Sequence, residues 1–155
     1  MAVNNVTRLL DARKVPYTAH ELPVEKLGAV EAARILNVDP GLVFKTIVIG
    51  REKAGKPVLA VVPGPGEVDL KKLAEFLGEK KLRLPTEREA EQITGLQAGG
   101  ISPLALLNKG FQVVIDQSAQ AHARIFISGG QRGLNIELPV QALAELTRAR
   151  FGPIS

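Results

Sequence analysis

A lysine lies inside an apolar run that is typical of a buried strand. Residues 43–49 are apolar except at Lys45 and Thr46. Because side chains alternate along a strand, Lys45 shares one face with Ile47 and Ile49. Its ammonium either extends outward from a sheet edge, or it projects into an apolar recess. In a recess, burial lowers the pKa of a lysine and makes it a strong hydrogen-bond donor to a carbonyl or a usable base. The sequence leaves both interpretations open.

A glycine-rich segment, residues 99–103, could bring backbone N–H groups close to a ligand. It has the sequence Gly-Gly-Ile-Ser-Pro, and paired glycines leave room that a Cβ would fill. The alternative is a plain connection between a helix and a strand. Ser102 does not fit the nucleophile elbow of hydrolases, because no glycine stands two residues after it. A triad would also need His20 or His122 as its base, and nothing in their spacing places either nearby.

A second glycine-rich segment, residues 128–133, has the sequence Ser-Gly-Gly-Gln-Arg-Gly. A phosphate-binding loop needs a helix immediately after the glycines, whereas residues 134–138 alternate like a strand. The segment is therefore better interpreted as a hairpin turn between two strands. Arg132 could still pair with a phosphate or a carboxylate from such a turn.

The composition limits the remaining chemistry. The chain has 155 residues, no Cys and two His, which excludes disulfides, thiolate nucleophiles and thiolate metal sites. We expect neither a metal nor a cofactor. The hydrophobic fraction of 45% and the charged fraction of 23% are ordinary for a globular protein. At roughly 150 residues per domain, we predict a single domain, residues 1–155.

The charge and hydropathy patterns bear on location and partners. The net charge of +4 favours polyanions such as nucleic acid, but it is also common among plain soluble proteins. The basic pairs and triplets are most simply solvated faces, since five Phe and one Tyr leave little to stack on bases. No stretch approaches the roughly 18 apolar residues of a membrane helix, and the first fifteen residues lack the apolar core of a secretory signal. We expect a cytoplasmic protein with no membrane partner.

Hydrophobic periodicity places these segments on a series of helices and strands. The predicted helices are residues 3–15, 29–38, 70–77, 87–94 and 139–144. The predicted strands are residues 17–22, 43–49, 58–62, 111–115, 124–128 and 134–138, with a turn over residues 53–57 and an irregular stretch over 97–110. This order predicts an α+β (mixed α/β) fold: a curved mixed β-sheet, partly barrel-like, with helices packed on its outside.

Three segments together resemble the YbaK/EbsC family. They are Phe44-Lys45-Thr46, the Gly-Gly-Ile-Ser-Pro segment and the hairpin turn, in this order and at these separations. The resemblance spans nearly the whole chain. The family comprises free-standing aminoacyl-tRNA deacylases related to the editing insertion domain of bacterial prolyl-tRNA synthetases. Such hydrolysis is needed because a synthetase pocket gains only about 1–3 kcal/mol per methylene and cannot exclude a smaller amino acid by binding alone.

The resemblance implies a set of site residues. Lys45 corresponds to the essential lysine of the family and would hold the substrate carbonyl or the terminal ribose. The implied substrate-binding residues are Leu27, Gly99, Gly100, Ile101, Ser102, Ser128, Gly129, Gly130, Arg132 and Asn135. The backbone of residues 100–102 would donate to the developing oxyanion, and Arg132 with the adjacent glycines would close the pocket. Leu27 and Asn135 stand where family members carry an aromatic residue and commonly an Asp, which bears on amino-acid preference.

The resemblance also implies a reaction and partners. The reaction is hydrolysis of mischarged aminoacyl-tRNA, with Cys-tRNA(Pro) or a similar small amino acid on tRNA(Pro) as the expected substrate. The thiol of cysteine would attack its own ester carbonyl, so the protein supplies orientation and charge stabilisation. The expected partners are the acceptor end of the mischarged tRNA and a prolyl-tRNA synthetase, and not DNA.

Two other interpretations remain open. In the first, the chain is a non-catalytic accessory protein that binds tRNA or a synthetase. In the second, it holds a small-molecule pocket in which Lys45 forms a Schiff base.

Overall fold

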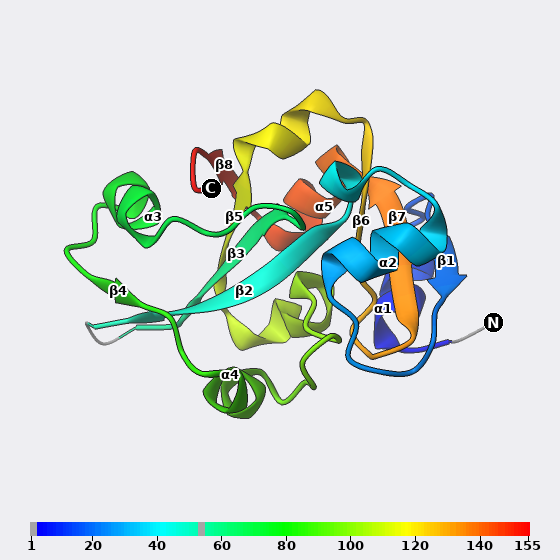
Figure 1. Ribbon diagram of the computed structural model, residues 1–155, viewed down its shortest axis with the longest axis horizontal. Helices are drawn as coiled ribbons and strands as arrows, with labels where there is room; N and C mark the ends of the chain where they lie inside the picture. Colours follow the sequence, from blue (N-terminus) through cyan, green and yellow to red (C-terminus); the bar gives the residue numbers. More distant parts are fainter. Residues whose placement is uncertain (1–2, 53–54) are drawn as a thin grey trace.

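The structure is a computed structural model that describes residues 3–52 and 55–155. Its helices are α1 (Asn5–Ala12), α2 (Ala29–Leu36), α3 (Leu70–Leu77), α4 (Glu87–Thr94) and α5 (Val140–Thr147), with 3-10 helices η1 (Pro40–Leu42), η2 (Pro103–Lys109) and η3 (Gln117–Ala121). Its strands are β1 (Thr18–Glu21), β2 (Phe44–Arg51), β3 (Val58–Pro63), β4 (Leu82–Arg83), β5 (Gln112–Asp116), β6 (Arg124–Ser128), β7 (Leu134–Pro139) and β8 (Arg150–Gly152). Figure 1 shows the helices on the outside of the strands.

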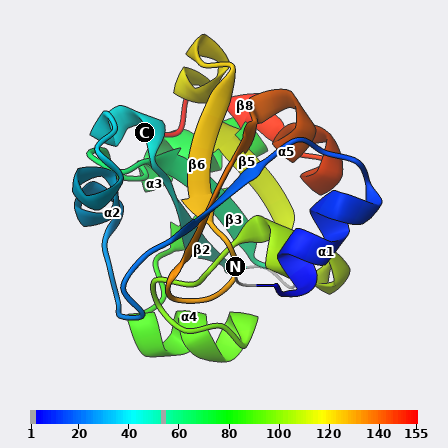
Figure 2. The ribbon, with the colours of Figure 1, turned by 90° about the vertical axis from the view of Figure 1, so that its right-hand side faces the viewer.

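The strands form two sheets. One has the order β4-β2-β3-β5-β8 and is mixed, because β2 is antiparallel to β3 and β4 whereas β5 is parallel to β3 and β8. The other is antiparallel, in the order β1-β7-β6, and lies nearer the viewer in Figure 2. A single bridge, Val43 to Phe126, joins them. The α+β prediction is confirmed. The partly barrel-like closure is not confirmed, because strand pairing within the described ranges ends at β1, β4 and β8.

The middle of β2 has an open edge. The Gly64 N–H donates to the Val43 carbonyl at 2.7 Å, which fixes the alternation of the antiparallel ladder with β3. By this alternation the backbone groups of Thr46 and Val48 point away from β3. On that side β4 pairs only with Gly50 and Arg51, and β6 only bridges to Val43. The stretch between these pairings therefore presents backbone donors and acceptors that none of the described strands uses.

The two faces of β2 and β3 are buried by different helices. Phe44 and Val48 lie in a cluster that includes Val6 of α1 and Leu143 of α5, whereas Ile49 lies in a second cluster with residues of α3. A third, smaller cluster packs α2 against the bridge between the sheets. Each fully buried Leu, Ile or Phe side chain stabilises the fold by about 1.5–3 kcal/mol. Within the described ranges, no helix has the length and apolarity needed to cross a bilayer.

The structure differs from the sequence-based elements in several places. Val3, predicted inside the first helix, is 65% exposed and precedes the N-cap Asn4. Pro139 ends β7 and is the N-cap of α5 rather than its first residue. The stretch predicted as irregular contains η2, and β4 and β8 were not predicted because two or three residues show no periodicity. Residues 53–54 of the predicted turn lie outside the described residues.

Asp116 is a buried carboxylate that fastens the C-terminal segment to β5. Its Oδ1 accepts the N–H groups of Ile154 and Ser155, each at 3.1 Å, and its Oδ2 accepts from Ser118. Burial alone would raise the pKa of Asp116. The hydrogen bonds from Ser118, Ile154 and Ser155 outweigh burial and hold the pKa below its ordinary value of 3.8.

We expect Asp116→Asn to lower the free energy of unfolding by about 1–3 kcal/mol at pH 7, because a hydrogen-bonded buried carboxylate is lost. Since folding lowers the pKa of this carboxyl, its stabilisation is present above about pH 3.8 and is lost as the pH falls through the folded-state pKa. Urea denaturation at pH 7 and pH 3 should therefore give a smaller difference between variant and wild type at pH 3. Ser118→Ala removes only the hydroxyl bond and leaves the three backbone N–H bonds from Ser118, Ile154 and Ser155 in place, so it is the matched control. An equal effect of the two substitutions at pH 7 would contradict this account.

Candidate functional site

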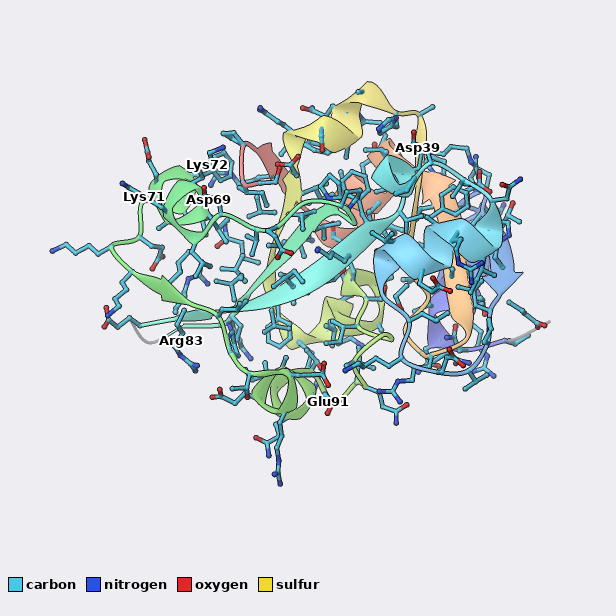
Figure 3. All side chains as sticks on the ribbon, in the orientation of Figure 1. Asp39, Asp69, Lys71, Lys72, Arg83 and Glu91 are labelled. Atoms are coloured by element: carbon cyan, nitrogen blue, oxygen red, sulfur yellow. The ribbon has the colours of Figure 1, made fainter. Side chains whose placement is uncertain are left out.

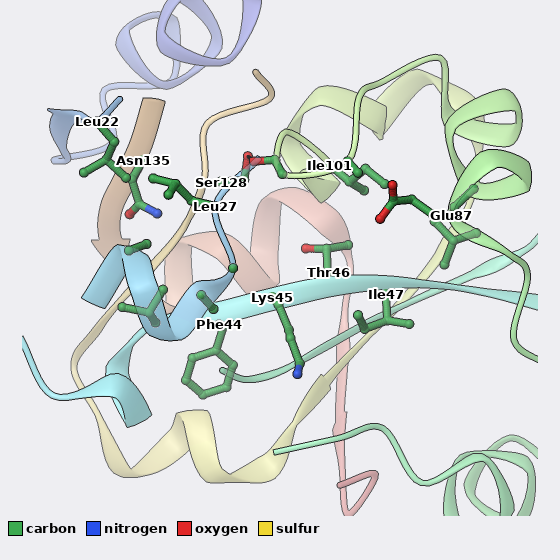
Figure 4. A pocket seen from close by; sticks show the side chains of 18 of the residues that line it. Leu22, Leu27, Phe44, Lys45, Thr46, Ile47, Glu87, Ile101, Ser128 and Asn135 are labelled. Carbon is green, nitrogen blue, oxygen red and sulfur yellow. Dashed lines mark hydrogen bonds between the residues drawn. The ribbon is translucent and has the colours of Figure 1, made fainter. Parts of the chain in front are cut away.

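A pocket of about 350 Å³ lies along the open edge of β2 (Figure 4). This volume falls in the range of small-molecule and cofactor sites. Five segments, far apart in the sequence, form its wall. They are the approach to α2 with its first turns (Leu22, Glu25, Leu27, Gly28, Ala29, Ala32), β2 with the residue before it (Val43, Phe44, Lys45, Thr46, Ile47, Val48), the approach to α4 and its start (Leu84, Pro85, Glu87, Ala90), the first glycine-rich segment (Ala98, Gly99, Ile101) and the hairpin with β7 (Ser128, Gly133, Leu134, Asn135).

Lys45 lies at the pocket with its ammonium held by the backbone. Its side chain is 26% exposed, and Nζ donates to the Gly64 carbonyl at 3.2 Å and lies 3.8 Å from a carboxylate oxygen of the exposed Glu67. The ammonium is therefore neither free in solvent nor enclosed. This environment is intermediate between the two sequence-based interpretations, a lysine extending from a sheet edge and a lysine buried in an apolar recess. Figure 4 shows Lys45 and Thr46 leaving β2 on opposite sides, with Thr46 on the side of Ser128 and Ile101.

The two glycine-rich segments are packed directly against each other. A Cβ on Gly100 would stand 2.9 Å from the Cα of Gln131, so only glycine allows this approach. Arg132 Nε donates to the Ala98 carbonyl at 2.7 Å, and the Ser128 hydroxyl donates to the Gly99 carbonyl at 3.4 Å. The paired glycines of residues 99–100 predict that no Cβ fits at this position. The structure shows that the second glycine-rich segment, residues 128–133, is what leaves no room for it.

The structure brings some of the predicted residues to the pocket wall and leaves others behind it. Lys45, Leu27, Gly99, Ile101, Ser128 and Asn135 line the pocket, whereas Gly100, Ser102, Gly129, Gly130 and Arg132 are not among the lining residues.

Each residue behind the wall has a local structural contact. Ser102 is fully buried, and its hydroxyl accepts the N–H of Leu104 at 3.2 Å as the cap of η2. A Cβ on Gly129 would stand 2.6 Å from Cγ of Leu134, and Gly130 has a φ of +93°. The guanidinium of Arg132 is bound to the first segment, as described above. These residues hold the wall in place.

Several wall residues were not identified from the sequence. Leu22, Ala32, Leu84 and Pro85 are apolar, and they reach the pocket through tertiary packing of α2 and of the approach to α4. Thr46 belongs to the Phe44-Lys45-Thr46 segment of the family resemblance, but it was not predicted as a site residue. The sequence signal for Thr46 was its place in the same strand as Lys45. Because side chains alternate along a strand, Thr46 points to the face opposite Lys45.

The ionisable wall groups are not arranged as an activated nucleophile. Thr46 and Ser128 supply the side-chain hydroxyls, and Glu87 is bound by Lys26, whose Nζ lies 2.9 and 3.1 Å from its two carboxylate oxygens. His20 is not a wall residue and bonds Glu137 at 3.2 Å. In the described part of the chain, no group of three or more His, Cys, Asp or Glu is placed to hold a metal ion.

Gly100→Ala should test whether the two segments interlock. The added Cβ would meet the backbone of Gln131 at 2.9 Å, so the segments must separate, and we expect a loss of about 1–3 kcal/mol in the free energy of unfolding. Gly66→Ala is the matched control, because its Cβ would meet Pro63 O at an ordinary contact distance of 3.6 Å. Thermal and urea unfolding measure both variants. Wild-type stability in Gly100→Ala would show that the two segments are not in contact as described.

Together the fold and the pocket define an α+β protein with a largely apolar ligand site, a lysine on an open strand edge and two interlocked glycine-rich segments. The sequence model of the aminoacyl-tRNA editing domain matches residues 24–146. The chain belongs to this family. The resemblance inferred from the three segments is therefore confirmed, and with it the enzyme class, a hydrolase of aminoacyl-tRNA esters.

Individual relatives agree with this assignment. EbsC of Enterococcus faecalis, which carries the provisional name Cys-tRNA(Pro)/Cys-tRNA(Cys) deacylase, is 38% identical over 97% of this chain and 92% of its own. The prolyl-tRNA editing protein ProX of Acetoanaerobium sticklandii is 26% identical over 90% of this chain and 87% of its own. A crystal structure with the provisional description of a trans-editing enzyme for prolyl-tRNA synthetase superimposes with a TM-score of 0.81, at 24% identity and 99% coverage of both chains. At that identity the superposition supports the fold alone.

Proposed function

We propose that this protein is a trans-editing deacylase that hydrolyses the ester of mischarged tRNA(Pro), with Cys-tRNA(Pro) or another small amino acid on tRNA(Pro) as its substrate. The observation that carries the proposal is the placement of Lys45 in the wall of a 350 Å³ pocket beside an open strand edge, in a chain of the editing family. A pocket of this size suits an aminoacyl group with part of its terminal nucleotide. The names of EbsC and ProX support the choice of tRNA(Pro) and cysteine.

Lys45 would polarise the substrate or hold its terminal ribose. Its ammonium is held by one carbonyl, that of Gly64, and an ester carbonyl or a ribose hydroxyl can take the place of this acceptor. The Ile101 N–H has no acceptor in the part of the chain that the structure describes, and the Thr46 N–H points to the open edge of β2. Preorganised N–H donors of this kind stabilise an oxyanion where it develops.

The substrate would supply the nucleophile. In Cys-tRNA(Pro), the sulfur attacks the ester carbonyl of the same residue. The S–C bond forms, the C–O bond to the ribose breaks, and the proton lost by the thiol passes to the ribose oxygen. Water then opens the thiolactone to free cysteine. The protein contributes the orientation that makes the intramolecular attack fast.

The partners follow from this reaction. The acceptor end of mischarged tRNA is the substrate, and we infer a prolyl-tRNA synthetase as the protein that presents it, in the cytoplasm. Figure 3 shows Lys71, Lys72 and Arg83 at the end of the molecule formed by α3 and β4, with Asp69 close by. The acidic residue among these cations lowers the local positive charge and favours a weak contact with the phosphates of tRNA.

Deacylation assays test the proposal directly. Cys-tRNA(Pro), Ala-tRNA(Pro) and Pro-tRNA(Pro) are incubated with the protein, with and without prolyl-tRNA synthetase. We expect the protein to accelerate the loss of one mischarged species and to leave the loss of Pro-tRNA(Pro) at its spontaneous rate. Hydrolysis of none of them, together with salt-sensitive tRNA binding, would instead establish the accessory-protein interpretation.

A further inference from the structure

Asn135 of β7 has an amide oxygen without a hydrogen-bond partner among the described residues. The residue is 5% exposed and lines the pocket. Across residues 3–52 and 55–155, its Oδ1 is the one buried side-chain nitrogen or oxygen atom without a hydrogen-bond partner. Figure 4 shows the amide among the lining side chains on the side of Leu22 and Leu27. A buried amide without a partner is costly, so a leucine would make a more stable wall.

The polar neighbours of Asn135 are already engaged. His20 and Ser128 lie opposite it on the two flanking strands, and their side chains share its face of the sheet. His20 Nε2 is bonded to Glu137 at 3.2 Å. The Ser128 hydroxyl donates to the Gly99 carbonyl at 3.4 Å. The amide of Asn135 is therefore available to hydrogen-bond a ligand in the pocket.

We propose that Asn135 is a specificity-determining residue whose amide carbonyl accepts an N–H of the substrate α-amino group. This inference rests on the proposed function. The α-amino group is the strong donor of an aminoacyl ester, since the ester oxygens only accept. Among the wall carboxylates, Glu87 is bound by Lys26 and Glu25 is exposed. Asn135 is thus the buried side-chain acceptor of the wall that can bind this donor, and it selects aminoacyl over simple acyl groups.

The test compares two substrates that differ only in the α-amino group, Cys-tRNA(Pro) and 3-mercaptopropionyl-tRNA(Pro). Each kcat/KM is divided by the spontaneous hydrolysis rate of the same ester, which removes the inductive effect of the amine. For the wild type we expect the normalised ratio to favour the aminoacyl ester by about 10- to 100-fold, the range for a hydrogen bond to a charged group. In Asn135→Leu the ratio should fall to about 1, while the melting temperature stays the same or rises. Opposite effects on stability and selectivity are not expected of a merely structural residue.

Two further variants make the result specific. Asn108→Leu, at an exposed asparagine of η2, is the matched control and should keep the wild-type ratio. Glu25→Gln tests the other acceptor. Loss of the ratio in Glu25→Gln, or its persistence in Asn135→Leu, would overturn the role of Asn135 while the deacylase proposal stands. Failure of the wild type to hydrolyse any mischarged tRNA would overturn both.

Discussion

Replacing Lys45 by alanine should lower kcat/KM for the mischarged tRNA by about 100- to 1,000-fold, the effect of removing one preorganised donor to a developing oxyanion. Nζ is held by a single backbone carbonyl, and Glu67, the carboxylate beside it, lies 3.8 Å away and is 90% exposed. No buried ion pair is broken, so the fold should lose little stability. The loss should therefore appear in single-turnover deacylation rates while the circular dichroism spectrum and melting temperature remain close to those of the wild type.

Two variants give this experiment its controls. Lys109→Ala removes an exposed lysine of η2 and should leave the rate unchanged. Lys45→Arg keeps a cation but cannot form a Schiff base, so partial activity in Lys45→Arg favours polarisation over covalent chemistry. If Lys45→Ala deacylates at the wild-type rate, Lys45 is not the catalytic residue. If it changes only tRNA affinity, the accessory-protein interpretation is the better one.

The site could be predicted from the sequence where a local pattern determines the position of a residue. Alternation within residues 43–49 correctly places Lys45 on the face of Ile47 and Ile49, because a strand turns successive side chains to opposite sides whatever it packs against. The hairpin turn between β6 and β7 was also predicted correctly, since Leu134–Leu138 alternates like a strand.

The rest of the site depends on contacts that no local pattern encodes. The pocket exists because β4 pairs with β2 only at Gly50 and Arg51, and a two-residue strand has no periodicity to detect. The Gly100 backbone is held against Gln131, thirty-one residues further along the chain, so the sequence shows that glycine is needed there without showing why. The same holds for Ser102, which caps η2 in a stretch that has no helical periodicity.

Blocking the substrate thiol should have a much larger effect than removing either hydroxyl of the pocket. Thr46 and Ser128 are the hydroxyl side chains of the wall, and neither is hydrogen-bonded to a histidine or a carboxylate within the described ranges. A hydroxyl without an adjacent base is a weak nucleophile at neutral pH. Orientation of the substrate thiol at its own ester carbonyl makes the attack intramolecular and avoids the entropy cost of bringing two molecules together. The thiol of the substrate therefore accounts for the reaction better than either hydroxyl.

We accordingly expect S-methylcysteinyl-tRNA(Pro) to be deacylated at least about 100-fold more slowly than Cys-tRNA(Pro), because methylation turns the attacking thiol into a thioether that cannot form the thiolactone, while leaving the ester and the α-amine intact. Ser128→Ala and Thr46→Val should each reduce the rate on Cys-tRNA(Pro) by less than about 10-fold, the loss of a neutral hydrogen bond. Single-turnover deacylation of both substrates by all three proteins measures these effects. Equal rates on the two substrates would mean that water attacks directly. Abolition of activity by Ser128→Ala alone would instead mean that Ser128 forms an acyl-enzyme. Since no protein base lies next to Ser128 in the described ranges, a group of the substrate would then have to act as the base.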